Sequence, residues 1–312
     1  WVRDFRVDAL RLDATHAIAD DSETHFVRAL CDAVSAVGRE DGRVVVVVAE
    51  NDENDREVLE PPPKGWGCSA VWADDLHHAI HALVTGERSQ FFADYGAPDD
   101  VRRALAEGFV YQGQLSPFRK RPHGTDPRGL APPRFVVCAQ NHDQVGNRPL
   151  GERLSTLVPF EALRPIAALV LLGGGTPLVF MGEEYGETRP FQYFTSHSDP
   201  ALAKAVSEGR KRELIAALGS GAQVPDPQDA ETFERSRLAP RLDGRHGELR
   251  DHYARLLALR RRHLDRIAAA WPSVRVDGRA FTLSRPGLEV VANLGREPAA
   301  GVPGWGCVVR ER

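Results

Sequence analysis

Residues Val7 to His16 read VDALRLDATH. Leucines alternate with polar side chains in this stretch, and a period of two predicts a short strand. Residues two apart on a strand share a face, so Arg11 and Asp13 are expected to point the same way. A neighbouring cation keeps a carboxylate ionised. The strand therefore delivers an ionised Asp13 to its C-terminal end, where α/β enzymes hold their reactive groups.

Composition excludes several classes of protein. Hydrophobic residues make up 42% of the 312 positions and charged residues 27%, as in ordinary globular proteins. The net charge of −4 comes from interspersed acids and bases, which predicts neither a nucleic acid nor an anionic membrane as partner. No apolar run approaches ~18 residues, so no membrane span is expected. The sequence gives no prediction of oligomeric state.

The chain begins at Trp1 and its one methionine is Met181, so we expect a processed product or a fragment. Its cysteines form no CxxC pair, which favours reduced, buried thiols in a cytoplasmic protein. They lie far apart, at Cys31, Cys68, Cys138 and Cys307.

Strand and helix patterns alternate after the first strand. Further strands are expected at 43–50, 70–75, 135–143 and 176–184, with the first of these buried on both faces. Helices are expected at 22–37 (with Ser22 as N-cap and Gly38 as stop), 76–87, 98–110 and 159–172, and a long loop at 111–134. Every predicted strand ends on acids or on a His–Asp pair: Asp13, Glu50, Asp74 and Asp75, His142 and Asp143, Glu183 and Glu184.

Such regular polar strand ends favour an α/β fold with parallel strands and a site at their C-terminal ends, and a (β/α)8 TIM barrel fits best. Five units cannot close that barrel, so we expect a partial barrel made of strands four to eight. Residues 220–246 are expected to be loop-like and 247–270 to form a basic helix. The predicted domains are 1–270, the C-terminal part of the barrel, and 271–312, a small β-sandwich-like domain with a hairpin turn at Asp277-Gly278.

Three acids at strand ends suit cleavage of a glycosidic bond by the retaining mechanism, in which two carboxylates stand about 5 Å apart. Asp13 is the candidate nucleophile and Glu50 the candidate acid/base, while Asp143 would bind sugar hydroxyls and favour the distorted ring. The alternative is that these acids are ordinary caps and ion pairs. Trp66 and Trp72 are candidates for stacking on sugar faces.

A zinc site is the rival interpretation, because His77 and His81 have the spacing of a helical zinc pair near Asp74 and Asp75. The intervening residues lack the glutamate of an HExxH motif. We therefore predict no metal.

Three motifs resemble the α-amylase superfamily of glycoside hydrolases: LRLDATH (10–16), VVVAEND (46–52) and QNHDQVGN (140–147). The resemblance implies that Asp13 is the nucleophile, Glu50 the acid/base and Asp143 the stabiliser of the transition state. It places Arg11 and His142 at subsite −1 and His16 on the leaving-group side.

Longer segments resemble one branch of that superfamily, which hydrolyses the α-1,4 bond next to the terminal trehalose of a maltooligosyltrehalose. They are VWADDLHHAIHALVTGE (71–87), YQGQLSPFRKRPHG (111–124), NHDQVGNRPLGERL (141–154), PLVFMGEEYGETRPFQYFTSH (177–197) and VPDPQDAETF (224–233).

This resemblance implies a maltooligosyltrehalose or a related α-glucan as substrate and no cofactor. It also implies that the cleft is lined by Asp74, Asp75, His77 and Glu183. The chain departs from the pattern at Ala9 and Ser196, and it lacks the superfamily's first motif, so we expect an N-terminal truncation. A glucan branching transferase and an inactive glucan-binding fragment remain as alternatives.

Overall fold

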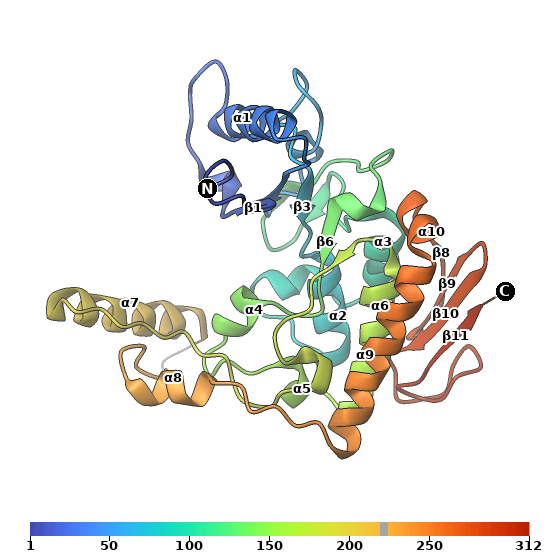
Figure 1. Cartoon of the computed structure of the whole chain (residues 1–312). Coiled ribbons are helices and arrows are strands. Elements are labelled where there is room, and N and C mark those ends of the chain that lie inside the picture. The colour runs from blue at the N-terminus through green and yellow to red at the C-terminus, as the bar shows by residue number, and fades with distance from the viewer. Residues whose placement is uncertain (219–223, 312) are drawn as a thin grey trace.

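A parallel sheet organises the chain (Figure 1). The computed structural model describes residues 1–218 and 224–311. Five strands lie in the order β1-β2-β3-β6-β7, and every neighbouring pair is parallel. They are β1 (Ala9–Leu12), β2 (Val46–Glu50), β3 (Ala70–Trp72), β6 (Phe135–Val137) and β7 (Thr176–Pro177). The predicted parallel α/β class is therefore confirmed.

The last three strands end earlier than the sequence predicts, and β3 ends at Trp72 instead of Asp75. Residues 142–146 form helix α4 (His142–Gly146), because the Asn141 side chain accepts hydrogen bonds from the backbone N–H groups of Asp143 and Gln144 at 2.9 and 3.2 Å and caps the helix. Glu183 likewise lies in the 3-10 helix η6 (Glu183–Tyr185). The expectation that strands run on to Asp143 and Glu184 is therefore wrong.

Helix α1 (Phe26–Glu40) covers one face of the sheet, but its predicted ends are wrong. Its N-cap is His25, whose Nδ1 accepts from the Val27 N–H at 3.3 Å, and Ser22 lies outside. Gly38 does not stop the helix: it is buried inside it, where an added Cβ would lie 2.8 Å from the Arg43 carbonyl oxygen. The glycine thus permits close packing of the helix on the chain before β2.

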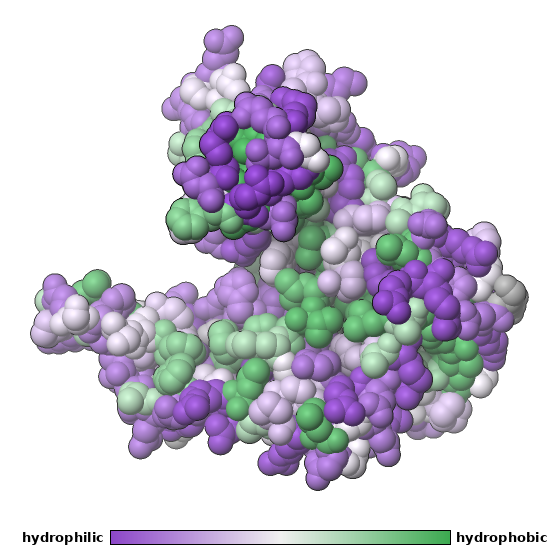
Figure 2. Space-filling view, in the orientation of Figure 1, coloured by the Kyte–Doolittle hydropathy of each residue, from purple (hydrophilic) through white to green (hydrophobic). Residues whose placement is uncertain are grey.

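Burial along β2 alternates, contrary to the expectation of two covered faces. Val47 and Ala49 are buried in the same core as the inner side of α1, whereas Val46 and Val48 are half-buried. Figure 2 shows a hollow in the surface between the α1 region at the top and the remainder of the molecule, with hydrophobic residues gathered near it. A strand that is covered on one face alone has this alternating pattern.

Helix α6 (Leu163–Gly173) contributes ten of its eleven residues to the buried interior. It is apolar on all sides, which is typical of a helix enclosed by other elements, and it packs against α9 (Gly244–Arg262) and the C-terminal sheet. Two arginines satisfy its C-terminal carbonyls: Arg260 donates to the Leu171 oxygen at 2.8 Å and Arg285 to that of Leu172 at 2.7 Å. The other helices of this part are α2 (Asp75–Thr85), α3 (Pro98–Glu107), α5 (Leu154–Leu157) and α10 (Leu264–Ala269).

The C-terminal residues form an antiparallel sheet with the strand order β11-β10-β9-β8. Its strands are β8 (Ser273–Asp277), β9 (Ala280–Arg285), β10 (Leu288–Asn293) and β11 (Cys307–Glu311). The predicted hairpin turn is present, with Gly278 at φ 59°. The expected C-terminal β region is therefore confirmed.

Two segments expected to be loops contain regular structure. Residues 111–134 include a hairpin of β4 (Gln114–Ser116) and β5 (Arg121–His123). Within 224–246 lies α8 (Ala230–Ser236), and residues 220–223 of the predicted loop are outside the described residues. Figure 1 also shows helix α7 (Pro200–Leu218), for which no prediction was made, extending away from the body.

Within the described residues, no helix combines the length and apolar character needed to cross a bilayer. All four cysteines are free thiols; three are buried, and Cys307 is half-buried.

Candidate active site

The candidate residues meet at the C-terminal edge of the parallel sheet. Asp13 directly follows β1, Glu50 ends β2, and Asp74 comes two residues after β3. Because parallel strands direct their carboxyl ends to the same edge, the order β1-β2-β3-β6 places these acids in sequence along it. Asp143 extends the series from α4, which follows β6.

Arg11 joins the first two acids. One terminal nitrogen of its guanidinium contacts Asp13 Oδ1, as the shared strand face predicts, and the other lies 3.3 Å from Glu50 Oε2. The same Glu50 oxygen accepts the backbone N–H of Ala14 at 2.6 Å, while Ala14 has a left-handed φ of 44°. The turn after β1 is therefore built around Glu50, and the two carboxylates lie within the span of one guanidinium.

Exposure separates these two acids. The Asp13 side chain is 78% exposed and faces the open edge, whereas that of Glu50 is 19% exposed. The Thr15 hydroxyl donates a hydrogen bond to the backbone carbonyl of Glu50 at 2.7 Å and so links the turn after β1 to the end of β2. Asp13 is thus accessible to solvent, whereas Glu50 is mostly buried.

Trp72 connects the Arg11 end of the site to the Asp143 end. The Arg11 guanidinium carbon lies 4.9 Å from the centre of the indole, and His142 meets the indole edge-on with ring centres 6.4 Å apart. Its Nε1 donates to Asp74 Oδ1 at 3.1 Å. Trp72, which was predicted to stack on sugar, therefore contacts three other residues of the site. Trp66, the other candidate, stacks on His25 with ring centres 4.3 Å apart and packs against the core.

Asp74 lies between Glu50 and Asp143. Burial raises the pKa of its carboxyl to about 7, and the negative charges of Glu50, Asp143 and Asp75 act in the same direction. The hydrogen bond from Trp72 opposes that shift. At neutral pH this carboxyl is therefore only partly ionised. A carboxyl with a raised pKa beside other acids is frequent at catalytic sites.

Asparagines position Asp143. Asn141 caps α4 with its side-chain oxygen, and its Nδ2 reaches Asp74 Oδ1 at 3.4 Å. Asn147, one turn further along, donates its Nδ2 to Asp143 Oδ1 at 2.8 Å. Neither asparagine is among the residues predicted from the sequence, although Asn is one of the residue types preferred at a helix N-cap.

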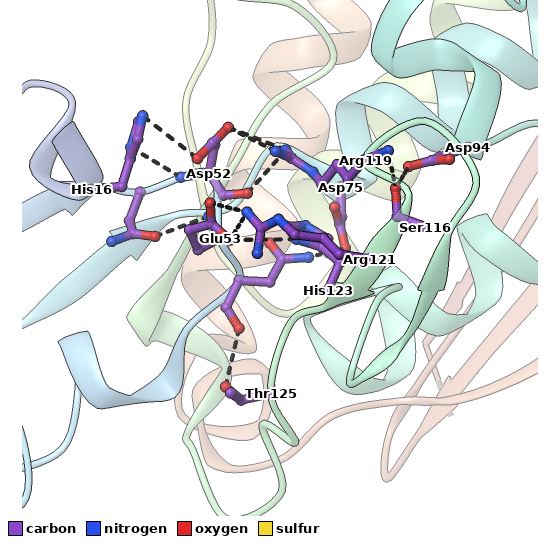
Figure 3. A network of polar contacts seen from close by, with 12 residues as sticks. His16, Asp52, Glu53, Asp75, Asp94, Ser116, Arg119, Arg121, His123 and Thr125 are labelled. Carbon is purple, nitrogen blue, oxygen red and sulfur yellow. Dashed lines mark hydrogen bonds and ion pairs between the residues drawn. The ribbon is translucent and has the colours of Figure 1, made fainter.

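His16 lies at the outer rim of the site. Its Nε2 is 3.5 Å from Asp52 Oδ1, in the loop after β2. Arg119 reaches the same carboxylate from the β4–β5 hairpin at 3.1 Å, and Arg121 and Glu53 form a second pair beside it. Figure 3 shows these arginines pointing from the hairpin toward the loop, so the hairpin is fastened over this side of the site.

Asp75 is placed differently from its neighbour Asp74. It is 3% exposed and accepts hydrogen bonds from Asn54 Nδ2 at 2.8 Å and from the Tyr95 hydroxyl at 2.6 Å. The backbone N–H groups of Val110 and Tyr111 also donate to it. A carboxylate with four donors holds together α2, the loop near Tyr95 and the start of the hairpin segment.

His77 and His81 are also buried, at 2% and 5% exposure. Nδ1 of His77 is 2.6 Å from the Ala139 carbonyl oxygen, and burial lowers the pKa of His77 to about 3. Nε2 of His81 is 2.9 Å from Glu87. Across the described ranges no group of three or more His, Cys, Asp or Glu side chains is placed to hold a metal ion.

Glu183 lies beneath the site, at 6% exposure. The Tyr253 hydroxyl of α9 donates to its Oε1 at 2.8 Å, and burial raises the pKa of its carboxyl to about 7. Burial raises the pKa of the Cys138 thiol, and the negative charges of Asp74 and Glu183 act in the same direction. The structure therefore brings Arg11, Asp13, Glu50, Asp74, His142 and Asp143 together at the open edge, with His16 at the rim, and leaves Asp75, His77 and Glu183 in the interior.

Comparison with known proteins gives sequence relatives. A malto-oligosyltrehalose trehalohydrolase of Rhizobium sp. (strain M-11) is 44% identical over 310 residues, which cover 96% of this chain and 52% of the relative. The enzyme of that name from Saccharolobus solfataricus is 41% identical over 264 residues, or 84% of this chain and 44% of the relative. The chain thus spans about half the length of the curated relatives it matches. No model of a protein family matches it.

Solved structures that are similar to this chain include a putative α-amylase and a cyclic maltosyl-maltose hydrolase. A putative α-amylase from Salmonella typhimurium is 34% identical, with a TM-score of 0.87 over 99% of this chain and 58% of that chain. The cyclic α-maltosyl-(1→6)-maltose hydrolase of Arthrobacter globiformis, at 13% identity and a TM-score of 0.52, shares the fold. Over nearly all of its own length, the chain is therefore similar in sequence to the malto-oligosyltrehalose trehalohydrolases, and it shares its fold with the putative α-amylase.

Proposed function

We propose that the chain carries the catalytic acids of a retaining glycoside hydrolase that cleaves the α-1,4 bond next to the terminal trehalose of a maltooligosyltrehalose and releases trehalose. The observation that carries this proposal is the Arg11 guanidinium, which contacts an exposed and an enclosed carboxylate with its two terminal nitrogens. Retaining glycosidases need two carboxylates that are close together but differ in environment. The names of the relatives support the substrate.

In the proposed mechanism Asp13 attacks the anomeric carbon, since its side chain is open to a substrate and is held in place by its contact with Arg11. Glu50 gives its proton to the leaving oxygen and then takes one from the water that hydrolyses the glycosyl–enzyme bond. Asp143, held by Asn147, stabilises the distorted ring by bonding to its hydroxyls. No step requires a metal or an organic cofactor.

The remaining predicted residues divide into two groups in this proposal. Arg11, His142, His16 and Asp74 contact substrate from the edge and rim of the site. Asp75, His77 and Glu183 support it from the interior, because each is buried and holds polar partners of the chain itself.

The finer fold assignment is also a proposal. The five parallel strands would be strands four to eight of a (β/α)8 barrel, supported by their consecutive order with crossovers between them. The domain boundary at 270/271 is supported by the end of α10 at Ala269 and the start of β8 at Ser273. A cytoplasmic location fits four unbridged thiols.

The test follows trehalose released from maltotriosyltrehalose. Because the chain spans about half of its relatives, the assay uses the chain alone and the chain joined to the part of the Rhizobium relative that it does not match. Asp13→Asn should abolish release, whereas Asp8→Asn, an acid exposed by 92% before the same strand, should leave it unchanged. Folded protein that transfers glucan without releasing trehalose would instead identify a branching transferase.

A further inference from the structure

A cavity of about 720 Å³ lies between the end of helix α2 and the loops of the C-terminal sheet. Small-molecule sites commonly have volumes of this order. Helix α2 begins beside the candidate active site and ends at this cavity, and its 11 residues span about 16 Å at 1.5 Å per residue. The described residues that line the cavity include none of the active-site candidates, so the two sites are separate.

The loop between β10 and β11 forms one wall of the cavity and is held in a single shape. Asn293, which is fully buried, donates its Nδ2 to the carbonyls of Glu297 at 2.8 Å and Pro303 at 3.2 Å. Its Oδ1 accepts the N–H of Gly295 at 2.9 Å. One side chain thus ties both ends of the loop, which lowers the entropy that a ligand would lose on binding.

Trp305 is held at the edge of this loop. Its backbone N–H donates to the Gly295 carbonyl at 2.9 Å, and its backbone has a left-handed φ of 56°, which costs energy for a residue of this size. The preceding Gly304 allows this arrangement, because an added Cβ there would lie 1.8 Å from the Arg296 carbonyl oxygen. The half-buried Trp305 packs against the core and also lines the cavity, with its backbone held in a strained conformation.

The remaining walls combine apolar and hydrogen-bonding groups. Leu83 and Leu157 supply apolar surface, while Arg279 is anchored by a hydrogen bond to the Leu83 carbonyl at 3.2 Å. Arg296 and Glu297 are exposed at the rim. The positive charge of Arg296 and the negative charge of Glu297 offset each other, so the rim favours a neutral ligand over an anion or a cation. The two side chains also offer both hydrogen-bond donors and acceptors.

A pyranose ring has an apolar face that stacks on an aromatic ring and an edge of hydroxyls that both donate and accept. We propose that this cavity is a second carbohydrate site, which takes a segment of a neutral α-glucan with one sugar stacked on Trp305. The choice of an α-glucan over other neutral saccharides rests on the proposed function of the active site.

The test uses the chain labelled with 5-fluorotryptophan and titrated with maltoheptaose up to 10 mM. Fluorine NMR gives a separate signal for each tryptophan, assigned by Trp→Phe substitution. The Trp305 signal should shift with saturation, and the signal of Trp1, which is 77% exposed and outside the cavity, should not. Arg296→Ala should weaken the binding seen at Trp305 about fivefold, whereas Arg261→Ala, an exposed arginine of α9, should not change it.

An unmoved Trp305 signal overturns the inference, whether or not the Trp72 signal of the active site shifts. A Trp305 shift caused by inorganic phosphate and not by maltoheptaose also overturns it and identifies an anion site. A Trp305 shift together with no trehalose release from the chain joined to the unmatched part of the Rhizobium relative supports the second site and rejects the proposed function, so the two failures are distinguishable.

Discussion

Replacing Asp75 by alanine tests whether this acid maintains the fold or binds substrate. Its two oxygens accept four hydrogen bonds, and two of the donors are the buried backbone N–H groups of Val110 and Tyr111. The side chains of Asn54 and Tyr95 can change rotamer, whereas the two backbone donors are fixed by the chain. A buried donor left without a partner costs about 1–3 kcal/mol. Asp75→Ala should therefore lower the free energy of unfolding by about 4 kcal/mol, the two backbone donors accounting for most of it.

The assay is urea unfolding followed by circular dichroism, with the unfolding free energy taken from the midpoint and slope. Asp75→Asn should be milder than Asp75→Ala, since the amide oxygen can still accept from the backbone donors. Asp74→Ala is the matched control: this neighbouring acid accepts from Trp72 and Asn141, and its loss should cost less than ~1 kcal/mol. An Asp75→Ala protein that keeps its stability within ~1 kcal/mol and loses substrate binding would refute the reasoning.

Three further predictions concern the acids at the open edge. Asp13→Asn should lower kcat for trehalose release by several orders of magnitude with little change in KM, and near-normal turnover would reject Asp13 as nucleophile. Glu50→Gln should slow substrates with poor leaving groups far more than activated aryl glycosides; equal losses would show that Glu50 does not donate the proton. The pKa of Asp74 is raised to about 7 in the folded chain, so between its ordinary value and pH 7 the folded state binds more protons than the unfolded state, and stability falls as the pH rises. Asp74→Asn removes this loss and should raise the unfolding temperature more at pH 8 than at pH 4; a gain that is the same at both pH values would contradict it.

Relations between residues at the C-terminal edge of the parallel sheet could be predicted from the sequence, because side chains two apart on a strand point the same way. Arg11 lies on β1, Asp13 directly follows that strand, and the two side chains contact each other as expected; Glu50 ends β2 as its valine run indicates. These relations depend on neighbours in the chain, which a pattern records directly.

Burial of the interior acids could not be predicted in the same way. Asp74 and Asp75 are adjacent and chemically identical, yet Asp75 turns into four donors that come from residues up to 36 positions away. The predicted end of β6 is wrong for a similar reason, since the Asn141 cap starts a helix where the sequence continues to resemble a strand. Long-range hydrogen bonds and caps decide these positions, and no local period reports them.

The most direct test of the account is trapping of the nucleophile. The chain joined to the unmatched part of the Rhizobium relative is incubated with a 5-fluoro-α-glucosyl fluoride, digested, and sequenced by mass spectrometry. The account predicts one fluoroglucosyl group, attached to Asp13, and none in Asp13→Asn. Label on another carboxylate, or a folded protein that releases trehalose without any label on Asp13, would contradict it.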